Sequence, residues 1–147
     1  MKALKQPQSV LVVIHTADLQ VLLIERADKP GYWQSVTGSR EGDEAMADTA
    51  HREVAEETGF AADAGQWQDW QQQNVYEIYP HWRHRYGEGV THNTEHVFSL
   101  QLPDTLRPTL APGEHLAWQW LPWEQAAERV FSPSNAEAIR ALPLRLI

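Results

Sequence analysis

The sequence predicts an α/β protein in which helices flank a mixed β-sheet, an α/β/α sandwich. Short apolar runs rich in β-branched residues are typical of buried strands, whereas stretches free of Gly and Pro with spaced apolar positions are typical of helices. These two kinds of segment follow one another with short connections. We expect one domain over residues 1–147, because a chain of 147 residues suits a single hydrophobic core.

The predicted strands lie before and after one central helix. Residues 9–14 (SVLVVI) and 21–25 (VLLIE) are apolar and β-branched, and a turn is expected between them. A short strand is expected over residues 34–37, before Gly38. Later segments show partial alternation and several aromatic residues, and the strands expected there are 75–79, 96–102 and 116–121.

The central helix is predicted over residues 44–58. Asp43 is expected to cap its N-terminus and Gly59 to end it. A helical spacing of small and apolar residues predicts one buried stripe, which comprises Met46, Ala47, Ala50 and Val54. Two further helices are expected over residues 123–130 and 134–142.

The composition disfavours several classes of function. The formal net charge of −8 argues against binding to nucleic acids or to anionic membranes, since both need a basic surface. The chain has no cysteine, which excludes disulfides and thiolate zinc sites and fits the reducing cytoplasm, where we expect the protein. The apolar run over residues 10–14 is too short for a signal peptide or a membrane span.

Three glutamates on the central helix are candidates for metal binding. Glu53, Glu56 and Glu57 stand at positions i, i+3 and i+4, which share one helix face. Each close pair of like charges costs roughly 0.2–0.5 kcal/mol on an exposed helix, and a cation offsets that cost. Oxygen ligands of this kind suit Mg²⁺ or Mn²⁺. The competing interpretation is a solvated acidic face, and we expect the glutamates to point away from the packed side of the helix.

The residues around these glutamates resemble the Nudix box of enzymes that cleave phosphoanhydrides. The string GSREGDE begins at Gly38 and is followed, after seven residues, by REVAEETGF, which ends at Phe60. Every fixed Gly, Glu and Arg position of that family's pattern is matched over residues 38–60. The resemblance implies the Nudix fold, a catalytic loop-helix-loop, and Mg²⁺ or Mn²⁺ as the cofactor.

The same resemblance assigns roles to residues of the box. Glu53 and Glu57 are the main metal ligands, and Glu56 is a further ligand or a partner of one. Gly38 permits a close approach of the backbone, and Arg52 orients a carboxylate such as that of Glu44. For Arg52, a purely structural ion pair is the alternative.

Strings outside the box resemble the dihydroneopterin triphosphate pyrophosphatases of bacterial folate biosynthesis. They are YWQSVTG from Tyr32, HRY from His84, GVT from Gly89, NTE from Asn93, EHLA from Glu114, and Trp120, Ser132, Ser134 and Asn135. The resemblance implies hydrolysis of dihydroneopterin triphosphate to dihydroneopterin monophosphate and pyrophosphate. It also implies that Glu114 completes the metal site or acts as the general base, where the alternative is a solvated loop acid. A glutamate of the box is the other candidate for the base.

The resemblance also implies a set of substrate contacts. Lys5 and Arg26 would bind triphosphate oxygens, or they are ordinary surface charges. The remaining candidates for contact with the substrate are Thr37, Tyr76, Glu77, Ile78, Tyr79 and Ser132. For these, strand packing or solvation is the alternative, and we favour plain packing for Ile78. If the segment is extended, His81, Arg83 and Arg85 would form one basic face that attracts an anion.

Two other functions compete with this interpretation. One is a Nudix pyrophosphatase that acts on nucleoside triphosphates, because purine and pterin rings are alike. The other is a non-catalytic Nudix domain that senses a nucleotide, although such domains usually lose box glutamates that this chain retains. The sequence does not indicate an oligomeric state. We expect a small-molecule substrate.

Overall fold

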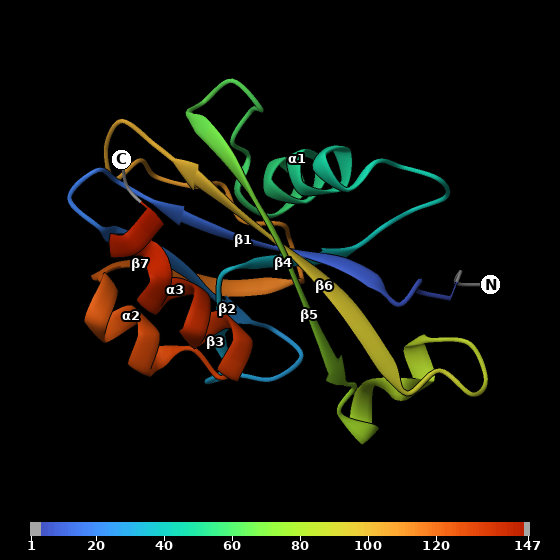
Figure 1. Ribbon diagram of the computed structural model, residues 1–147. Helices are drawn as coiled ribbons and strands as arrows, with labels where there is room; N and C mark the ends of the chain where they lie inside the picture. The colour runs from blue at the N-terminus through green and yellow to red at the C-terminus, as the bar shows by residue number, and fades with distance from the viewer. Residues whose placement is uncertain (1–3, 146–147) are drawn as a thin grey trace.

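The computed structural model describes residues 4–145 and shows a seven-stranded mixed sheet with helices on both faces (Figure 1). The strand order is β3-β2-β1-β6-β5, with β4 beside β1 and β7 beside β2. Helix α1 covers one face, and α2 and α3 cover the other. The predicted α/β/α sandwich is therefore confirmed.

The elements follow the order strands, helix, strands, helices. The strands are β1 (Gln8–His15), β2 (Gln20–Arg26), β3 (Trp33–Gln34), β4 (Val36–Ser39), β5 (Gln66–Glu77), β6 (His92–Gln101) and β7 (His115–Pro122). The helices are α1 (Met46–Thr58), the 3-10 helix η1 (Pro80–Arg85), α2 (Trp123–Arg129) and α3 (Pro133–Arg145). None of the helices within residues 4–145 has the length and apolar character needed to cross a membrane.

Strand β1 lies at the centre of the sheet and has different neighbours along its length. It pairs in parallel with β6 from Gln8 to His15. On its other side it pairs with β4 over residues 9–12, but it pairs with β2 only where His15 meets Val21. The strands β4 and β2 therefore pair with different parts of β1. Residues from both strands line the cleft described below.

The alternation of β1 divides the core into two layers. Val10, Val12 and Ile14 pack with α1 residues such as Val54, whereas Leu11 and Val13 pack with α2 and α3. Successive side chains of a strand point to opposite faces, so a continuous apolar run fills both layers. Full burial of such a side chain contributes about 1.5–3 kcal/mol each.

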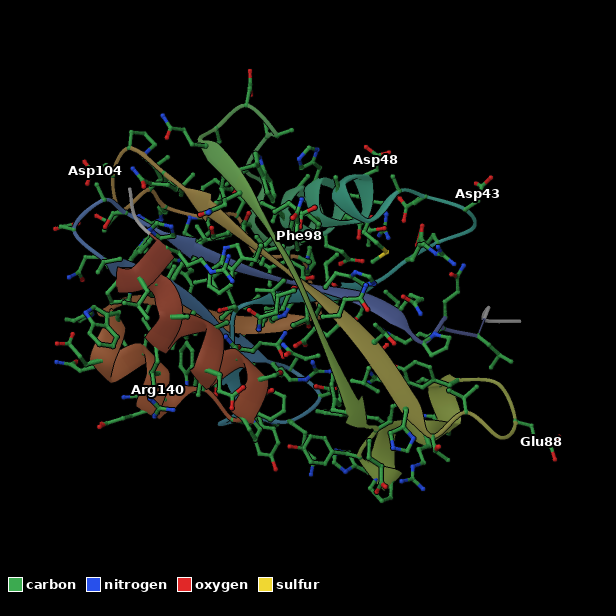
Figure 2. All side chains as sticks on the ribbon, in the orientation of Figure 1. Asp43, Asp48, Glu88, Phe98, Asp104 and Arg140 are labelled. Atoms are coloured by element: carbon green, nitrogen blue, oxygen red, sulfur yellow. The ribbon has the colours of Figure 1, made fainter. Side chains whose placement is uncertain are left out.

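Helix α1 begins later than predicted. Its N-cap is Ala45, without a side-chain hydrogen bond, and Asp43 is exposed in the preceding loop (Figure 2). The expected Asp43 cap and the start at residue 44 were wrong, because the Glu44 carboxylate instead accepts hydrogen bonds from the Glu41 amide and the Thr49 hydroxyl. The Gly59 terminus is confirmed, since this residue has φ 77° and donates to the Ala55 carbonyl.

The buried side of α1 also differs from the predicted stripe. Ala50 and Val54 are fully buried and Met46 is partly buried, as expected. Ala47 is exposed, which contradicts the prediction, and Thr49 is buried instead. The stripe therefore follows the i, i+4, i+8 row from Met46 through Ala50 to Val54.

The region from residue 66 to residue 85 departs most from the prediction. Strand β5 begins at Gln66 and ends at Glu77, whereas only residues 75–79 were predicted. The strand is rich in glutamine and has no regular alternation of apolar and polar residues. A bulge at Gln71 (φ 52°) interrupts its pairing with β6. The next segment is the 3-10 helix η1, so the extended basic face that was considered for His81, Arg83 and Arg85 does not form.

Candidate active site

One cleft of about 1590 Å³ collects nearly all the residues that the sequence singled out. It is lined from β2 by Arg26, from β4 by Thr37 and Gly38, and from α1 by the glutamates of the box. The remaining candidate residues in the lining are Lys5, Arg52, Tyr76, Glu77, Ile78, Tyr79, Glu114 and Ser132. Glu44 is the one candidate outside this lining.

The three glutamates of α1 differ sharply in their exposure. The Glu57 side chain is 5% exposed, that of Glu53 is 13% exposed, and that of Glu56 is 54% exposed. All three line the cleft, as expected for side chains that point away from the apolar stripe, but Glu57 is buried there rather than solvated. Burial and the neighbouring charge of Glu53 raise the pKa of the Glu57 carboxyl well above its ordinary value. Burial also raises the pKa of Glu53.

Glu57 has no hydrogen-bond donor that satisfies its buried oxygen. Within residues 4–145, its Oε1 accepts no hydrogen bond, and the nearest basic atom is His115 Nε2 at 3.5 Å. Burial lowers the pKa of His115, so the imidazole is neutral near pH 7 and supplies no charge. A buried carboxylate is costly without a partner. Glu57 is therefore poised to accept a cation or a proton.

Gly38 lies against the Glu53 carboxylate. A Cβ atom at position 38 would overlap the Cδ and both oxygens of Glu53. Glycine is therefore required by close packing against an acid rather than by a positive φ, since Gly38 is not among the residues with φ above zero.

Arg52 and Glu44 form a clamp behind the acids. Arg52 Nε donates to Glu44 Oε2 at 2.9 Å, and its other nitrogens donate to Glu53 Oε1 at 2.8 Å and to the Ser39 carbonyl at 2.9 Å. The hydrogen bond from Arg52 lowers the pKa of Glu44 to about 2. Arg52 therefore contacts one carboxylate outside the cleft and one inside it, which fixes the orientation of Glu53.

Glu114 approaches the same end of the cleft from the loop before β7. It is exposed, it lines the cleft, and its charge contributes to the raised pKa of Glu57. Its backbone carbonyl accepts a hydrogen bond from Ala27, which ties the loop to the end of β2.

These acids fit a divalent cation. Glu53 and Glu57 lie one helical turn apart, burial raises the pKa of both, the neighbouring Glu53 carboxylate raises that of Glu57 further, and a Glu57 oxygen lacks a donor. Within residues 4–145, no three acidic or imidazole groups already converge at metal-ligand spacing. A divalent cation would be held here by two helix carboxylates, with water and substrate oxygens as its further ligands, a coordination that suits Mg²⁺.

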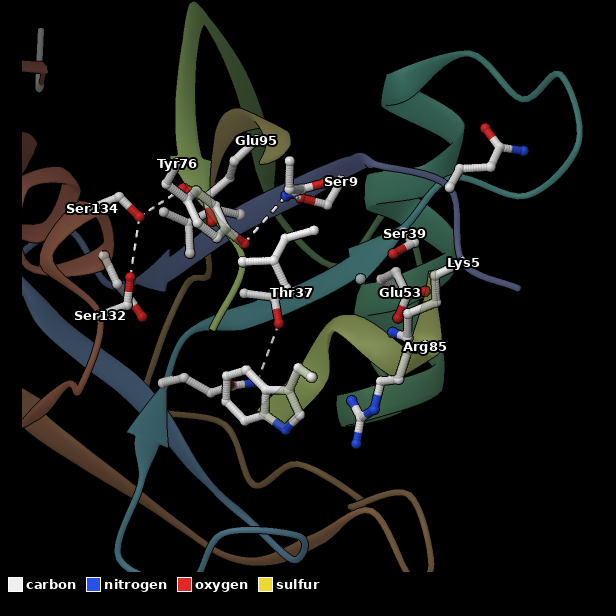
Figure 3. A pocket seen from close by; sticks show the side chains of 18 of the residues that line it. Lys5, Ser9, Thr37, Ser39, Glu53, Tyr76, Arg85, Glu95, Ser132 and Ser134 are labelled. Atoms are coloured by element: carbon white, nitrogen blue, oxygen red, sulfur yellow. Dashed lines mark hydrogen bonds between the residues drawn. The ribbon is translucent and has the colours of Figure 1, made fainter. Parts of the chain in front are cut away.

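Cationic side chains border the cleft next to the acids. Arg26 donates to both Asp28 oxygens at 2.8 Å, and Arg85 donates to Asp28 Oδ2 at 2.7 Å. The Arg26 guanidinium also lies 4.5 Å from the centre of the Trp82 ring. Figure 3 shows Lys5 and Arg85 on the same side of the pocket as Glu53. Of the basic cluster in η1, Arg85 borders the cleft, whereas Arg83 bonds the Ile78 carbonyl and the Glu77 carboxylate.

The other end of the cleft is lined by polar and aromatic groups. In Figure 3, Tyr76, Glu95, Ser132 and Ser134 lie together across the pocket from Glu53. Ser132 Oγ and Ser134 Oγ are 3.1 Å apart, and Ser134 donates to Glu95 Oε1 at 2.8 Å. Phe131 lines the cleft beside this group.

The candidates from residues 76–79 occupy different environments. Tyr76 accepts a hydrogen bond from Asn93 at 3.1 Å. Ile78 is 3% exposed and lines the cleft, so the packing role favoured for it stays a prediction. Tyr79 is exposed and stacks with His81 at a centroid distance of 5.6 Å. Thr37 Oγ1 accepts a hydrogen bond from Gln34 at 3.3 Å.

Sequence reasoning did not assign roles to three residues of this cleft. Asp28 joins two arginines, His115 lies beside Glu57, and Glu95 is a buried acid in β6. For Glu95, the alternation of β6 carried a signal, because an acid occupies an inward position in the series that includes Val97. The other two depend on loop and strand contacts between distant segments, which spacing does not reveal.

Comparison with known proteins decides the family. The model of the NUDIX domain matches residues 5–142. This chain belongs to the Nudix family. Its Nudix domain is similar to the dihydroneopterin triphosphate diphosphatase of Escherichia coli (strain K12), which is 45% identical over 141 residues, or 94% of this chain and 93% of that enzyme. The enzyme of the same name from Haemophilus influenzae is 40% identical over 139 residues, or 92% of this chain and 87% of that enzyme.

A solved structure gives the same result for the Nudix fold. The E. coli dihydroneopterin triphosphate pyrophosphohydrolase superimposes with a TM-score of 0.91 at 42% identity, and the match covers 99% of this chain and 100% of that one. The resemblance stated from the sequence is confirmed. Nudix hydrolases generally need a divalent metal ion, in agreement with the fit of the acids on α1.

Proposed function

We propose that this Nudix enzyme hydrolyses dihydroneopterin triphosphate to dihydroneopterin monophosphate and pyrophosphate, a reaction of folate biosynthesis. The relatives that are 40–45% identical over most of the chain support this substrate. The observation that carries the proposal is the division of one cleft into two ends. One end holds crowded acids bordered by arginines, and the other holds polar groups and aromatic rings, which suits a triphosphate joined to a flat heterocycle.

Glu53 and Glu57 would hold Mg²⁺, with Glu56 or Glu114 as further ligands. The ion would neutralise charge on the phosphates and lower the pKa of a bound water. Mn²⁺ suits the same oxygen donors. Arg52 keeps the Glu53 carboxylate in place through its bonds to Glu53 and the Ser39 carbonyl.

The cationic border would bind the substrate's phosphates. Arg26 and Arg85 are held in position by Asp28, and Lys5 lies on the same side of the pocket. Preoriented cations lose little conformational entropy on binding, so these contacts serve orientation as well as attraction.

Hydrolysis requires a carboxylate to take a proton from the attacking water. The candidates are Glu114, which is exposed in the cleft, and a glutamate of α1. The water oxygen forms a bond to phosphorus while the bond between the α-phosphorus and the bridging oxygen, or between that oxygen and the β-phosphorus, breaks. The proton passes to the carboxylate and then to the departing phosphate.

Two measurements test the proposal: the preference among substrates, and the product that takes up ¹⁸O from labelled water. With Mg²⁺, kcat/KM for dihydroneopterin triphosphate is expected to exceed that for GTP, ATP and CTP at least about tenfold, because adenine and cytosine mismatch the hydrogen-bond partners and guanine differs from the pterin in ring size. Hydrolysis in ¹⁸O-labelled water, with both products identified, shows which phosphorus is attacked. A preference below tenfold contradicts the pterin as the substrate. If no pyrophosphate is released, the protein is not a pyrophosphatase.

A further inference from the structure

Glu95 is a buried carboxylate without a cationic partner. It is 4% exposed, and no Lys, Arg or His of residues 4–145 forms an ion pair with it. Buried acids are nearly always paired, because an isolated charge away from water is costly. Burial raises the pKa of Glu95 above its ordinary value. A buried acid without such a pair is a candidate for binding a ligand.

The hydrogen bonds of Glu95 leave one oxygen available. Ser134 Oγ donates to Oε1 at 2.8 Å, and the Asn74 side chain donates to the same atom at 3.5 Å. Oε2 receives no hydrogen bond from residues 4–145, and Glu95 lines the cleft. Oε2 is therefore free to accept a hydrogen bond, and Oε1, whose contact with Asn74 is long at 3.5 Å, retains a lone pair for a second one.

The neighbours of Glu95 fit a flat heterocycle rather than a phosphate. Tyr76, Ser132 and Ser134 surround it, and Phe131 lines the same end of the cleft (Figure 3). The Glu95 carboxylate disfavours a phosphate at this end of the cleft, because like charges repel there. Arg85 and Lys5 lie on the Glu53 side of the pocket instead.

We propose that Glu95 reads the 2-amino-4-oxo edge of the substrate ring. Resting on the proposed function, this inference assigns the choice of heterocycle to one side chain. A pterin ring and a guanine ring each present a ring N–H beside an amino group, two donors that a carboxylate accepts together. Adenine presents an amino group beside a ring acceptor, and cytosine does the same, so each would set one lone pair against the carboxylate. Uracil offers its single N–H between two carbonyl oxygens.

Neighbouring residues make Glu95 a directed acceptor. Ser134 stands in the first turn of α3, and Asn74 stands opposite Glu95 in the β5–β6 pairing. These two elements hold the carboxylate from both sides. The buried side chain of Asn93, two residues earlier on the same face of β6, bonds Ser9 at 2.7 Å and Tyr76 at 3.1 Å.

GTP and ITP provide a test that needs no variant, since ITP differs from GTP only by the missing 2-amino group. The unaltered enzyme is expected to show a kcat/KM for GTP about 10- to 100-fold above that for ITP, as one hydrogen bond to a charged group gives a discrimination of that order. Equal values for the two nucleotides would overturn the inference.

A matched pair of variants then assigns the discrimination to Glu95. Glu95→Gln keeps the shape but turns an N–H₂ group toward one ring donor, so the GTP to ITP ratio is expected to fall to about 3 or less. Glu124→Gln, the same change on exposed helix α2 away from the cleft, is expected to keep the unaltered ratio. Ser134→Ala removes the hydrogen bond that orients Oε1 and should give an intermediate ratio.

The ratio separates ring recognition from a structural role. Simple loosening of the β6–α3 contact lowers both rates alike and leaves the ratio unchanged, and that result would refute the proposal. A fall in the ratio together with poor hydrolysis of dihydroneopterin triphosphate would support the role of Glu95 and contradict the proposed substrate. Good hydrolysis of dihydroneopterin triphosphate with an unchanged ratio would support the proposed substrate and contradict the role of Glu95.

Discussion

Replacement of Glu57 by glutamine is expected to make the metal-free protein more stable. The Glu57 side chain is 5% exposed, and its Oε1 has no hydrogen-bond donor within residues 4–145. An unsatisfied buried polar group costs about 1–3 kcal/mol. Glutamine keeps the shape, removes the charge, and offers an N–H to the neutral His115 nitrogen 3.5 Å away. We expect a gain of about 1–2 kcal/mol, or about 2–8 °C in Tm for a chain of this size.

The gain from Glu57→Gln depends on pH in a defined direction. Burial raises the folded-state pKa of Glu57, whereas the unfolded chain has a value of about 4.3. As pH rises, the unfolded chain releases this proton first, so the metal-free wild type loses stability until the pH passes the folded-state pKa. The Tm difference between variant and wild type should therefore be small at pH 4 and grow toward pH 8.

Thermal unfolding in EDTA and in Mg²⁺ tests this expectation. Magnesium at one hundred times its Kd stabilises a binding protein by about 2.7 kcal/mol, and this rise should appear in the wild type and disappear in Glu57→Gln. Glu56→Gln is the matched stability control, because its side chain is 54% exposed and substitutions of that kind change stability by about 0.5 kcal/mol or less. A metal-free Glu57→Gln protein less stable than wild type at pH 8 would refute the reasoning.

Three further substitutions have defined outcomes. Gly38→Ala displaces the Glu53 carboxylate and should lower kcat about 100-fold with little change in Tm, since the displaced group is the end of a flexible side chain; unchanged kcat would contradict the packing role of Gly38. Glu114→Ala should lower kcat and alter its dependence on Mg²⁺, and unchanged kinetics would contradict a role of Glu114 in catalysis or metal binding. Gly59→Ala should lower the free energy of unfolding, measured by denaturant titration, by about 1–2 kcal/mol, because φ is 77° and the added Cβ would lie 3.2 Å from Thr109. The kcat per folded molecule should stay unchanged.

Where the local signal was strong, the sequence predicted the fold well. The apolar runs of β1 and β2 and the Gly59 terminus of α1 were found from patterning and turn chemistry. Strand β5 was largely missed, because its residues are polar and its position is fixed by pairing with β6. Tertiary pairing stabilises such an edge strand without an alternating pattern of its own.

The candidate site shows the same division. The spacing of Glu53 and Glu57 predicted that they share a face, but it did not predict that one is buried and the other clamped by Arg52. That difference arises from packing against β7 at His115 and from the Ser39 carbonyl at the end of β4, which accepts a hydrogen bond from Arg52. Contacts between segments distant in sequence leave no spacing to detect, and Glu95 went unassigned for the same reason.

Binding of Mn²⁺ beside a substrate analogue tests whether Glu57 and its neighbours hold a metal ion against the phosphates. Electron paramagnetic resonance counts bound Mn²⁺, and ³¹P relaxation of α,β-methylene GTP reports whether that ion lies against the phosphates. Mn²⁺ is expected to bind the wild type and to broaden the ³¹P signals strongly, and Glu57→Gln is expected to abolish both effects. Equal Mn²⁺ binding and equal broadening in the two proteins would contradict this role of Glu57.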